Sequence, residues 1–287
     1  MQKKKPKIPF FFRILPKVFP IFELLLPKKA DEFIVKMFFT PLNFKVPKEE
    51  TTFKLTANLD SILFNDEELM TYQWGDPNGK VVFFMHGWAG RGTQFRKFIA
   101  PLAEQGFNVI AIEGPGHSHS KKKMTNVLEF AECLSAFLKD KEVYACVGHS
   151  LGGIALLYAV AHFELKTKKL ITIATPTIAE DIINVYRAKI GATKRAYKAI
   201  YEYVQDKKKK SFAYYSGAEI AKRINPQELK FHLIIHDEND REAPVSNAYE
   251  IHKTLEYSEI FTTQNLGHVR ILKDEAVIKK VVNYINL

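Results

Sequence analysis

A serine between two glycines lies at the junction of two regular elements. The motif Gly-x-Ser-x-Gly is centred on Ser150, after an apolar run of strand-type residues that begins at Val143 and before a predicted buried helix at 154–161. A sharp strand-to-helix turn strains the serine backbone, exposes the hydroxyl and leaves no room for side chains at Gly148 and Gly152. The pattern predicts a nucleophilic serine, with an idle serine in a tight turn as the alternative.

A serine hydroxyl is a weak nucleophile at neutral pH, so it needs a base within hydrogen-bond reach and a carboxylate that orients the base. We expect both partners on loops that follow late strands, at the same edge of the sheet. Asp240 follows a predicted strand at 231–236, and His268 follows one at 260–263. The chain order Ser150, Asp240, His268 is one that a strand-turn-helix serine site uses.

Other side chains compete for both roles. Asp237 and Glu238 lie in the same loop as Asp240, which we prefer because it lies at the loop tip before a proline that turns the chain. His117 and His119 lie in a loop near the same edge and stay alternatives for the base. The remaining histidines are expected in packed elements, in supporting loops or turned away from the serine: His86, His149, His162, His232, His236 and His252.

Serine attack on an acyl carbon creates an oxyanion that backbone N–H groups must stabilise. Leu151, at the predicted helix start, offers one donor. We expect the second from Trp88, in the loop after a buried strand at 80–85, because Gly87 lets the backbone turn sharply there. The alternative for His86 and Gly87 is a simple turn that ends a strand.

Strands and helices alternate at short spacing along most of the chain. Two antiparallel strands are predicted at 51–59 and 68–74, and the later alternation predicts an α/β fold with a mostly parallel central sheet and helices on both faces. Between 177 and 229 the alternation stops, and helical stretches rich in Tyr, Lys and Ala predict a cap, with a surface insertion as the alternative. The predicted segments are 1–50, which packs on the core or cap, 51–176 and 230–287, which form the core, and 177–229, the helical cap.

The N-terminal segment 10–26 is apolar, but prolines and charged residues interrupt it, and lysines precede it. No small-x-small cleavage pattern follows, so a signal peptide is not expected. The segment is also too broken to span a bilayer as one helix of about 20 apolar residues. We expect it to pack on the domain or over the active-site mouth, with contact of residues 1–30 with a membrane surface as the alternative.

Composition limits the remaining classes of function. The chain has 287 residues, 46% of them hydrophobic, and a formal net charge of +10 that comes largely from lysine runs at 3–5, 121–123 and 207–210. No zinc-finger spacing or RNA-binding signature accompanies these runs, so no nucleic acid partner is expected. Cys133 and Cys146 lie in apolar segments and should be reduced. We expect a cytoplasmic protein of unspecified oligomeric state, with peripheral membrane association left open.

These motifs together resemble the α/β-hydrolase fold superfamily over most of residues 70–287, apart from the insertion. Glu113 stands where that family more often has aspartate, and Ser118 where it usually has glycine; both lie in a supporting loop. The resemblance implies no metal and no organic cofactor, and it says little about substrate. The motifs that carry it are His86-Gly87-Trp88, Glu113-x-Pro115-Gly116-His117, Gly148-His149-Ser150-Leu151-Gly152-Gly153, Asp240-x-x-Ala243-Pro244 and Gly267-His268.

The leading hypothesis is a serine hydrolase that cleaves a small-molecule carboxylic ester of small or medium acyl length, with thioesters left open. Ser150 would form the acyl-enzyme, His268 would carry the proton, and Asp240 would orient His268. Leu151 and Trp88 would bind the oxyanion. The alternatives are a C–C bond hydrolase or acyltransferase with the same residues, and a membrane-surface binding protein that keeps the fold.

Overall fold

The computed structural model describes residues 10–118, 120–208 and 212–287. His119, the lysine run at 3–5 and part of the run at 207–210 therefore lie outside the described residues. The described residues fall into two compact units. The helical unit takes its residues from Met1–Phe39 and Glu180–Phe212, and the core unit from Thr40–Ala179 and Ala213–Leu287.

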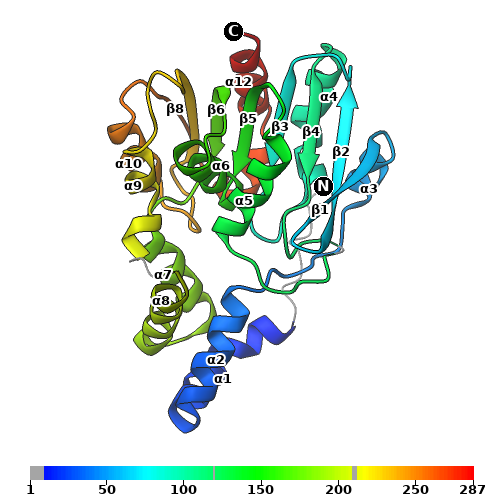
Figure 1. Cartoon of the computed structure of the whole chain (residues 1–287). Helices are drawn as coiled ribbons and strands as arrows, with labels where there is room; N and C mark the ends of the chain where they lie inside the picture. The colour runs from blue at the N-terminus through cyan, green and yellow to red at the C-terminus, as the bar shows by residue number, and fades with distance from the viewer. Residues whose placement is uncertain (1–9, 119, 209–211) are drawn as a thin grey trace. The chain divides into compact units, whose positions relative to one another are not determined.

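The core unit is built on one sheet. Its described strands are β1 (Asn58–Phe64), β2 (Glu67–Gly75), β3 (Val81–Met85), β4 (Asn108–Ile112), β5 (Val143–His149), β6 (Thr167–Ile173), β7 (Phe231–Asp237) and β8 (Glu259–Thr263). They form an eight-stranded sheet in the order β1-β2-β4-β3-β5-β6-β7-β8 (Figure 1). β2 pairs antiparallel with β1 and β4, and the other pairs are parallel. The predicted mostly parallel sheet is confirmed.

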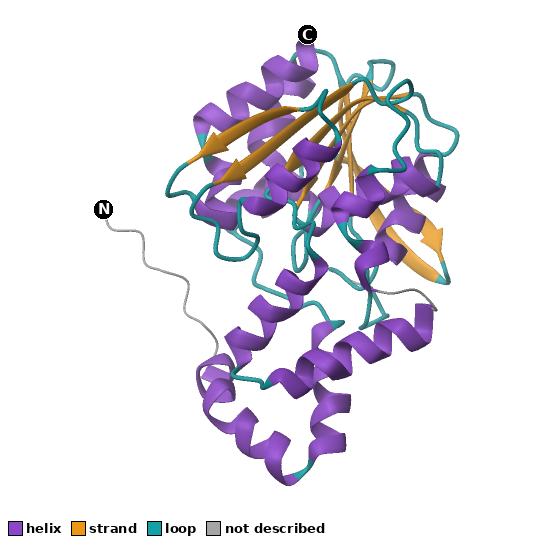
Figure 2. Cartoon of the chain, turned by 90° about the vertical axis from the view of Figure 1, so that its left-hand side faces the viewer, coloured by secondary structure: helices purple, strands orange, loops and turns teal. Residues whose placement is uncertain are grey.

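Helices cover both faces of the sheet (Figure 2). One face packs against α5 (Val127–Leu138), α6 (Leu151–His162), α9 (Gly217–Ala221) and α10 (Ser246–Thr254). The other face packs against α4 (Arg96–Glu104) and α12 (Glu275–Asn286). Short 3-10 turns complete the core unit: η1 (Gly92–Phe95), η2 (Phe212–Tyr215) and η3 (Ile271–Lys273).

The central strands are apolar throughout because both of their faces are covered. Phe83 and Phe84 are neighbours in β3, and their side chains point into opposite hydrophobic layers. Neither side chain is exposed to solvent. The rigid strand ends that result carry the loops of the candidate site.

The strand predicted at 51–59 is wrong. Lys48–Lys54 instead forms helix α3, which follows Pro47. Glu49 and Glu50 lie in its first turn, where acidic side chains stabilise the N-terminus of a helix. Threonine is typical of strands, so the alternation resembled a strand. In the helix the Thr51 hydroxyl bonds the carbonyl oxygen of Pro47, four residues back, at 3.2 Å.

A hairpin joins β1 to β2, and the sequence analysis missed it. Asn65 and Asp66 form its two-residue turn with φ values of 48° and 62°. Phe64 pairs directly with Glu67 across this turn. Asn and Asp tolerate positive φ, so this dipeptide between strand-like runs is the signal that could have placed β1.

The helical unit combines two segments that are distant in the sequence. α1 (Phe10–Leu25) and α2 (Pro27–Phe38) share a hydrophobic core with α7 (Ala179–Ile190) and α8 (Lys194–Lys208). α1 continues through the prolines at positions 16 and 20. In the described part of the chain, no helix has the length and apolar character needed to cross a bilayer. The segment boundaries predicted from the sequence stay predictions.

The substitution Gly191→Ala should destabilise the helical unit. Gly191 has a φ of +71°, and an added Cβ would lie 2.4 Å from the carbonyl oxygen of Pro16 in α1. A left-handed conformation costs a residue with a Cβ about 1–2 kcal/mol, and the backbone clash adds about 1–3 kcal/mol. Urea unfolding followed by circular dichroism measures the loss.

The matched control is Gly106→Ala, because Gly106 has a φ of +84° and nothing within 4 Å of an added Cβ. It should cost only the conformational part, about 1–2 kcal/mol. Equal losses for the two variants would contradict the close approach of Gly191 to Pro16.

Candidate active site

Ser150 lies in a strained turn between β5 and α6. Its φ is 52° and its ψ is −122°, a conformation that L-residues rarely adopt and that costs about 1–3 kcal/mol. An added Cβ on Gly148 would lie 2.6 Å from the Cα of Gly153, and one on Gly152 would lie 2.3 Å from the carbonyl oxygen of Met85. The two glycines that flank the serine are therefore required by backbone crowding.

His268 lies between Ser150 and Asp240. Its Nε2 is 2.9 Å from the Ser150 Oγ, and its Nδ1 is 2.7 Å from the Asp240 Oδ2. Only 11% of the His268 side chain is exposed, and that of Asp240 is fully buried. His268 lies in α11 (Gly267–Arg270), a short helix where the sequence predicted a loop, because one turn is too short to show helical periodicity.

Asp240 is held as an ionised carboxylate. Burial alone would raise its pKa, but the His268 ring and the backbone N–H groups of Ala243 and Glu242 outweigh burial and lower the pKa. Those N–H groups donate to Oδ1 at 3.0 and 2.7 Å. The other oxygen, Oδ2, is left to face the imidazole. The carboxylate can therefore fix the orientation of the ring.

Asp237, the alternative acid, braces the strand ends. Its Oδ2 accepts hydrogen bonds from the Thr263 hydroxyl and the Leu266 N–H, both at 2.9 Å. Its Oδ1 accepts from Asn239 N–H at 3.0 Å. These bonds tie the end of β7 to the segment that carries His268. Asp237 thus acts on the position of the loop and leaves the contact with the histidine to Asp240.

Two further histidines hold the site in place, and the sequence analysis assigned them no such role. His149 Nε2 lies 2.8 Å from the backbone carbonyl oxygen of His268. His236 Nε2 lies 2.7 Å from the carbonyl oxygen of Ala243, beside Asp240. Burial lowers the pKa of His149 to about 3, and burial also lowers the pKa of His236. Both rings are therefore neutral and donate an N–H to a carbonyl.

The loop after β3 lies directly against the serine turn. An added Cβ on Gly87 would lie 2.8 Å from the Ser150 Cβ and 2.9 Å from the His149 carbonyl oxygen. Trp88 follows Gly87 directly, and Leu151 is the first residue of α6. The first N–H groups of a helix have no acceptor within the helix. Trp88 and Leu151, the two predicted oxyanion donors, thus both lie in backbone segments close to Ser150.

His86 and His117 support this loop. His86 Nε2 accepts from Gly114 N–H at 2.8 Å, and its Nδ1 lies 2.8 Å from the Gly87 carbonyl oxygen. His117 Nε2 accepts from Ala89 N–H at 2.9 Å. Burial lowers the pKa of His117 to about 4 and that of His86 well below its ordinary value. The His117 ring is bonded to the loop, so His268 is the base candidate in contact with Ser150.

Glu113 lies beneath the same loop and carries an unusual protonation equilibrium. Its Oε1 accepts from Gly92 N–H at 3.2 Å, and the Tyr72 hydroxyl also bonds its carboxyl group. Burial raises the pKa of Glu113 to about 7 despite these bonds and despite the nearby Arg91. The carboxyl group therefore changes charge close to neutral pH.

Glu113 should make the fold less stable as the pH rises. The folded chain disfavours the ionised form, so stability is full below the ordinary pKa of 4.5 and falls until the pH passes the folded pKa of about 7. The substitution Glu113→Gln removes this loss. The free energy of unfolding of the variant, relative to the unmodified chain, should therefore be higher at about pH 8 than at about pH 5, by about 2–3 kcal/mol.

Urea unfolding at both pH values measures how the effect of the substitution changes with pH. The control is Glu142→Gln, at an exposed residue. The control should show no such change between the two pH values. A Glu113→Gln effect that is the same at both pH values would show that the carboxyl group does not titrate in this range.

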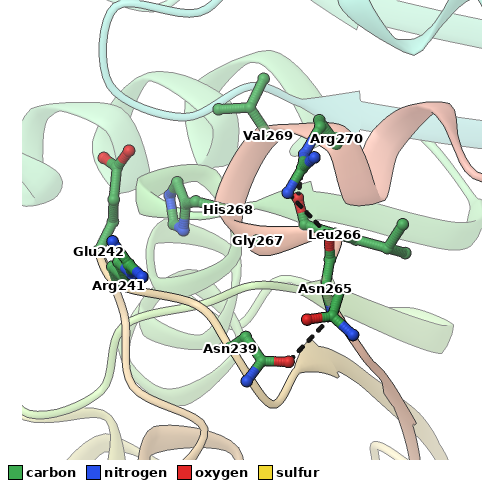
Figure 3. Close-up of a pocket in the computed structure, with 9 residues that line it drawn as sticks. All are labelled: Asn239, Arg241, Glu242, Asn265, Leu266, Gly267, His268, Val269 and Arg270. Carbon is green, nitrogen blue, oxygen red and sulfur yellow. Dashed lines mark hydrogen bonds between the residues drawn. The ribbon is translucent and has the colours of Figure 1, made fainter.

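A pocket of about 430 Å³ with a mixed polar and apolar lining borders His268 (Figure 3). Arg270 closes one side, where its guanidinium donates to the carbonyl oxygens of Leu266 and Asn265, each at 2.7 Å. Asn239 accepts from Asn265 N–H at 3.0 Å and so joins the two loops. Among the described residues, no group of three or more His, Cys, Asp and Glu side chains is placed to hold a metal ion. The lining residues are Asn239, Arg241, Glu242, Asn265, Leu266, Gly267, His268, Val269 and Arg270.

Comparison with known sequences finds similarity over part of the core unit. A family model for the α/β-hydrolase fold matches residues 80–190, which include the loop after β3 and the serine turn. A Mycoplasma pneumoniae protein named esterase/lipase 3 is 23% identical over 149 residues, which span 50% of this chain and 54% of that protein. A serine hydrolase-like protein of Dictyostelium discoideum is 34% identical over 102 residues, 31% of this chain and 27% of that protein. The matches thus cover about half or less of each relative.

Solved structures extend the similarity over more of the chain. A crystal structure described as a lipase from Acinetobacter baumannii superposes with a TM-score of 0.64 at 19% sequence identity. The superposition covers 85% of this chain and 97% of that one. At this level of identity the likeness concerns the fold alone.

Proposed function

Because the chain has the α/β-hydrolase fold, we propose that it is a serine hydrolase that cleaves carboxylic esters through an acyl-enzyme on Ser150. The observation that carries this proposal is the position of His268, 2.9 Å from the Ser150 Oγ and 2.7 Å from Asp240. A buried serine–imidazole–carboxylate chain of this geometry is the arrangement that activates a hydroxyl for acyl transfer.

In the proposed reaction the Ser150 Oγ attacks the acyl carbon while His268 Nε2 takes its proton. Asp240 holds the Nδ1–H and stabilises the imidazolium that forms. His268 then gives the proton to the leaving alcohol, the ester C–O bond breaks, and the acyl group stays on Ser150. Water enters, loses a proton to His268 and attacks the acyl carbon, and the returning proton releases Ser150 with the carboxylic acid.

The N–H groups of Leu151 and Trp88 would hold the negative charge that develops on the acyl oxygen. The crowding at Gly87 and Gly152 supports this assignment, because it brings both backbone segments against the serine. A single such donor is typically worth about 3–4 kcal/mol of transition-state stabilisation. The donors cost nothing to reorganise because the strained turn and the neutral histidines fix them beforehand.

The pocket beside His268 offers space and charged side chains for a leaving group. It is lined by Arg241, Glu242 and Arg270, and it borders the residue that must protonate the departing oxygen. Small-molecule esters fit this description, and thioesters stay open, as do C–C bond cleavage and acyl transfer to an acceptor other than water. The predicted cap stays a prediction; its residues Glu180–Phe212 belong to the helical unit.

The substitution Ser150→Ala tests the nucleophile. It should reduce turnover of p-nitrophenyl esters by at least about 10³-fold, because no acyl-enzyme can form. Labelling by a fluorophosphonate should disappear together with turnover. The thermal unfolding curve should stay nearly unchanged, since alanine fits the same backbone position.

The matched control is Ser135→Ala in α5, which should keep both turnover and labelling. Turnover by Ser150→Ala close to that of the unmodified chain would overturn the proposed function. Panels of diketones and of alternative acyl acceptors then distinguish ester hydrolysis from the two other reactions.

A further inference from the structure

α1, which is blue in Figure 1, has several large aliphatic side chains that are exposed to solvent. These side chains recur on one side of the helix at spacings of three and four residues, the spacing of one helical face. Their exposed fractions reach 58% for Ile21, 80% for Leu24 and 69% for Leu25. We call this set the α1 apolar face; its members are Ile14, Val18, Ile21, Leu24 and Leu25.

The opposite side of α1 already fills the core of the helical unit. Leu15 and Phe19 are buried there in one cluster with residues of α2, α7 and α8. Glu23 also turns inward, where its carboxylate accepts from Thr193 N–H at 2.8 Å. One side of the helix therefore packs within the helical unit. The other side is also apolar, although it is exposed and does not contribute to the core of this unit. An exposed apolar surface of this kind marks an interaction site.

The charges around the α1 apolar face are positive. Arg13, Lys17, Lys28 and Lys29 are exposed within or directly after α1. Glu23 is the single acidic residue in the sequence between positions 13 and 29, and its side chain is buried. The surface thus combines exposed aliphatic side chains with four exposed cations that are their neighbours in the sequence. An anionic surface with an apolar interior complements it on both counts.

The length of α1 determines how such a surface could be used. The helix has 16 residues, so it is about 24 Å long. That is shorter than the hydrocarbon core of a bilayer, about 30 Å. An amphipathic helix of this kind lies in the plane of the membrane, with its apolar side about 5–10 Å into the headgroup boundary and its cations at the lipid phosphates.

We propose that the α1 apolar face docks this protein on anionic lipid membranes. The inference goes beyond the proposed hydrolase activity, because it concerns where the protein works and involves none of the residues around Ser150. A protein docked in this way would meet esters that partition into lipid. The docking would weaken at high salt, because its electrostatic part is screened.

Co-sedimentation of the full chain with phospholipid vesicles tests this proposal. Vesicles of phosphatidylcholine with about a third phosphatidylserine should bind the protein at low salt, and phosphatidylcholine alone should bind it at least about tenfold less. The double variant Ile21→Ser and Leu24→Ser should reduce binding to the anionic vesicles at least about tenfold. The variant Ser150→Ala should bind like the unmodified chain, so that loss of docking and loss of catalysis are separate results.

Two matched controls keep the test specific. Leu59→Ser with Leu63→Ser removes comparably exposed aliphatic side chains from edge strand β1 and should leave binding unchanged. Replacing Lys17, Lys28 and Lys29 by Gln should weaken binding to anionic vesicles. The same change at Lys139, Lys166 and Lys253, which are also exposed, should weaken it much less.

Absence of binding to anionic vesicles would overturn the proposal, as would equal binding by the Ile21→Ser and Leu24→Ser variant. Size-exclusion chromatography with light scattering tests the alternative that a second copy of the chain binds the α1 apolar face. A dimer that becomes a monomer in this variant, without vesicle binding, would assign the α1 apolar face to a second copy and also overturn the proposal.

Discussion

Close approach of backbone segments around Ser150 is the constraint on which the rest of the site depends. Gly87, Gly148 and Gly152 each lie so near another part of the chain that a single added carbon would collide with it. This crowding holds Ser150 at a φ of 52° and brings the loop after β3 against the start of α6. The strain costs free energy locally, and the apolar sheet buried on both faces offsets it.

Neutral histidines turn this constraint into a rigid site. Burial lowers the pKa values of His86, His117, His149 and His236, so each ring can donate one hydrogen bond to a carbonyl and none needs a counter-charge. His149 bonds the carbonyl oxygen of His268, and His236 bonds that of Ala243 in the Asp240 loop. His86 and His117 bond backbone groups of the loop after β3 and of the segment after β4. Such bonds fix the positions of the loops without competing for the Ser150 hydroxyl. The proposed transition-state stabilisation would require such a preorganised arrangement.

The sequence predicted the sheet and the places of Ser150, Asp240 and His268, because parallel strands bring the residues after them to one edge. Their catalytic roles stay predictions. The histidine contacts could not be predicted, since the bond from His149 to His268 spans 119 residues and leaves no local pattern. The helix at Lys48–Lys54 was hidden by an alternation that resembles a strand. The exposure of one apolar side of α1 could not be predicted either, since the sequence shows which residues are apolar but not which of them other parts of the chain cover.

The central claim is that Asp240 orients His268 toward Ser150, and comparison of Asp240→Asn with Asp237→Asn tests it most directly. Asparagine at 240 favours the wrong imidazole tautomer, so kcat for an ester should fall about 10⁴-fold while the fold is kept. Asparagine at 237 should lower the free energy of unfolding and leave kcat within about tenfold, because that carboxylate braces the strand ends. A near-normal kcat for Asp240→Asn, or an equal loss at both positions, would contradict the account.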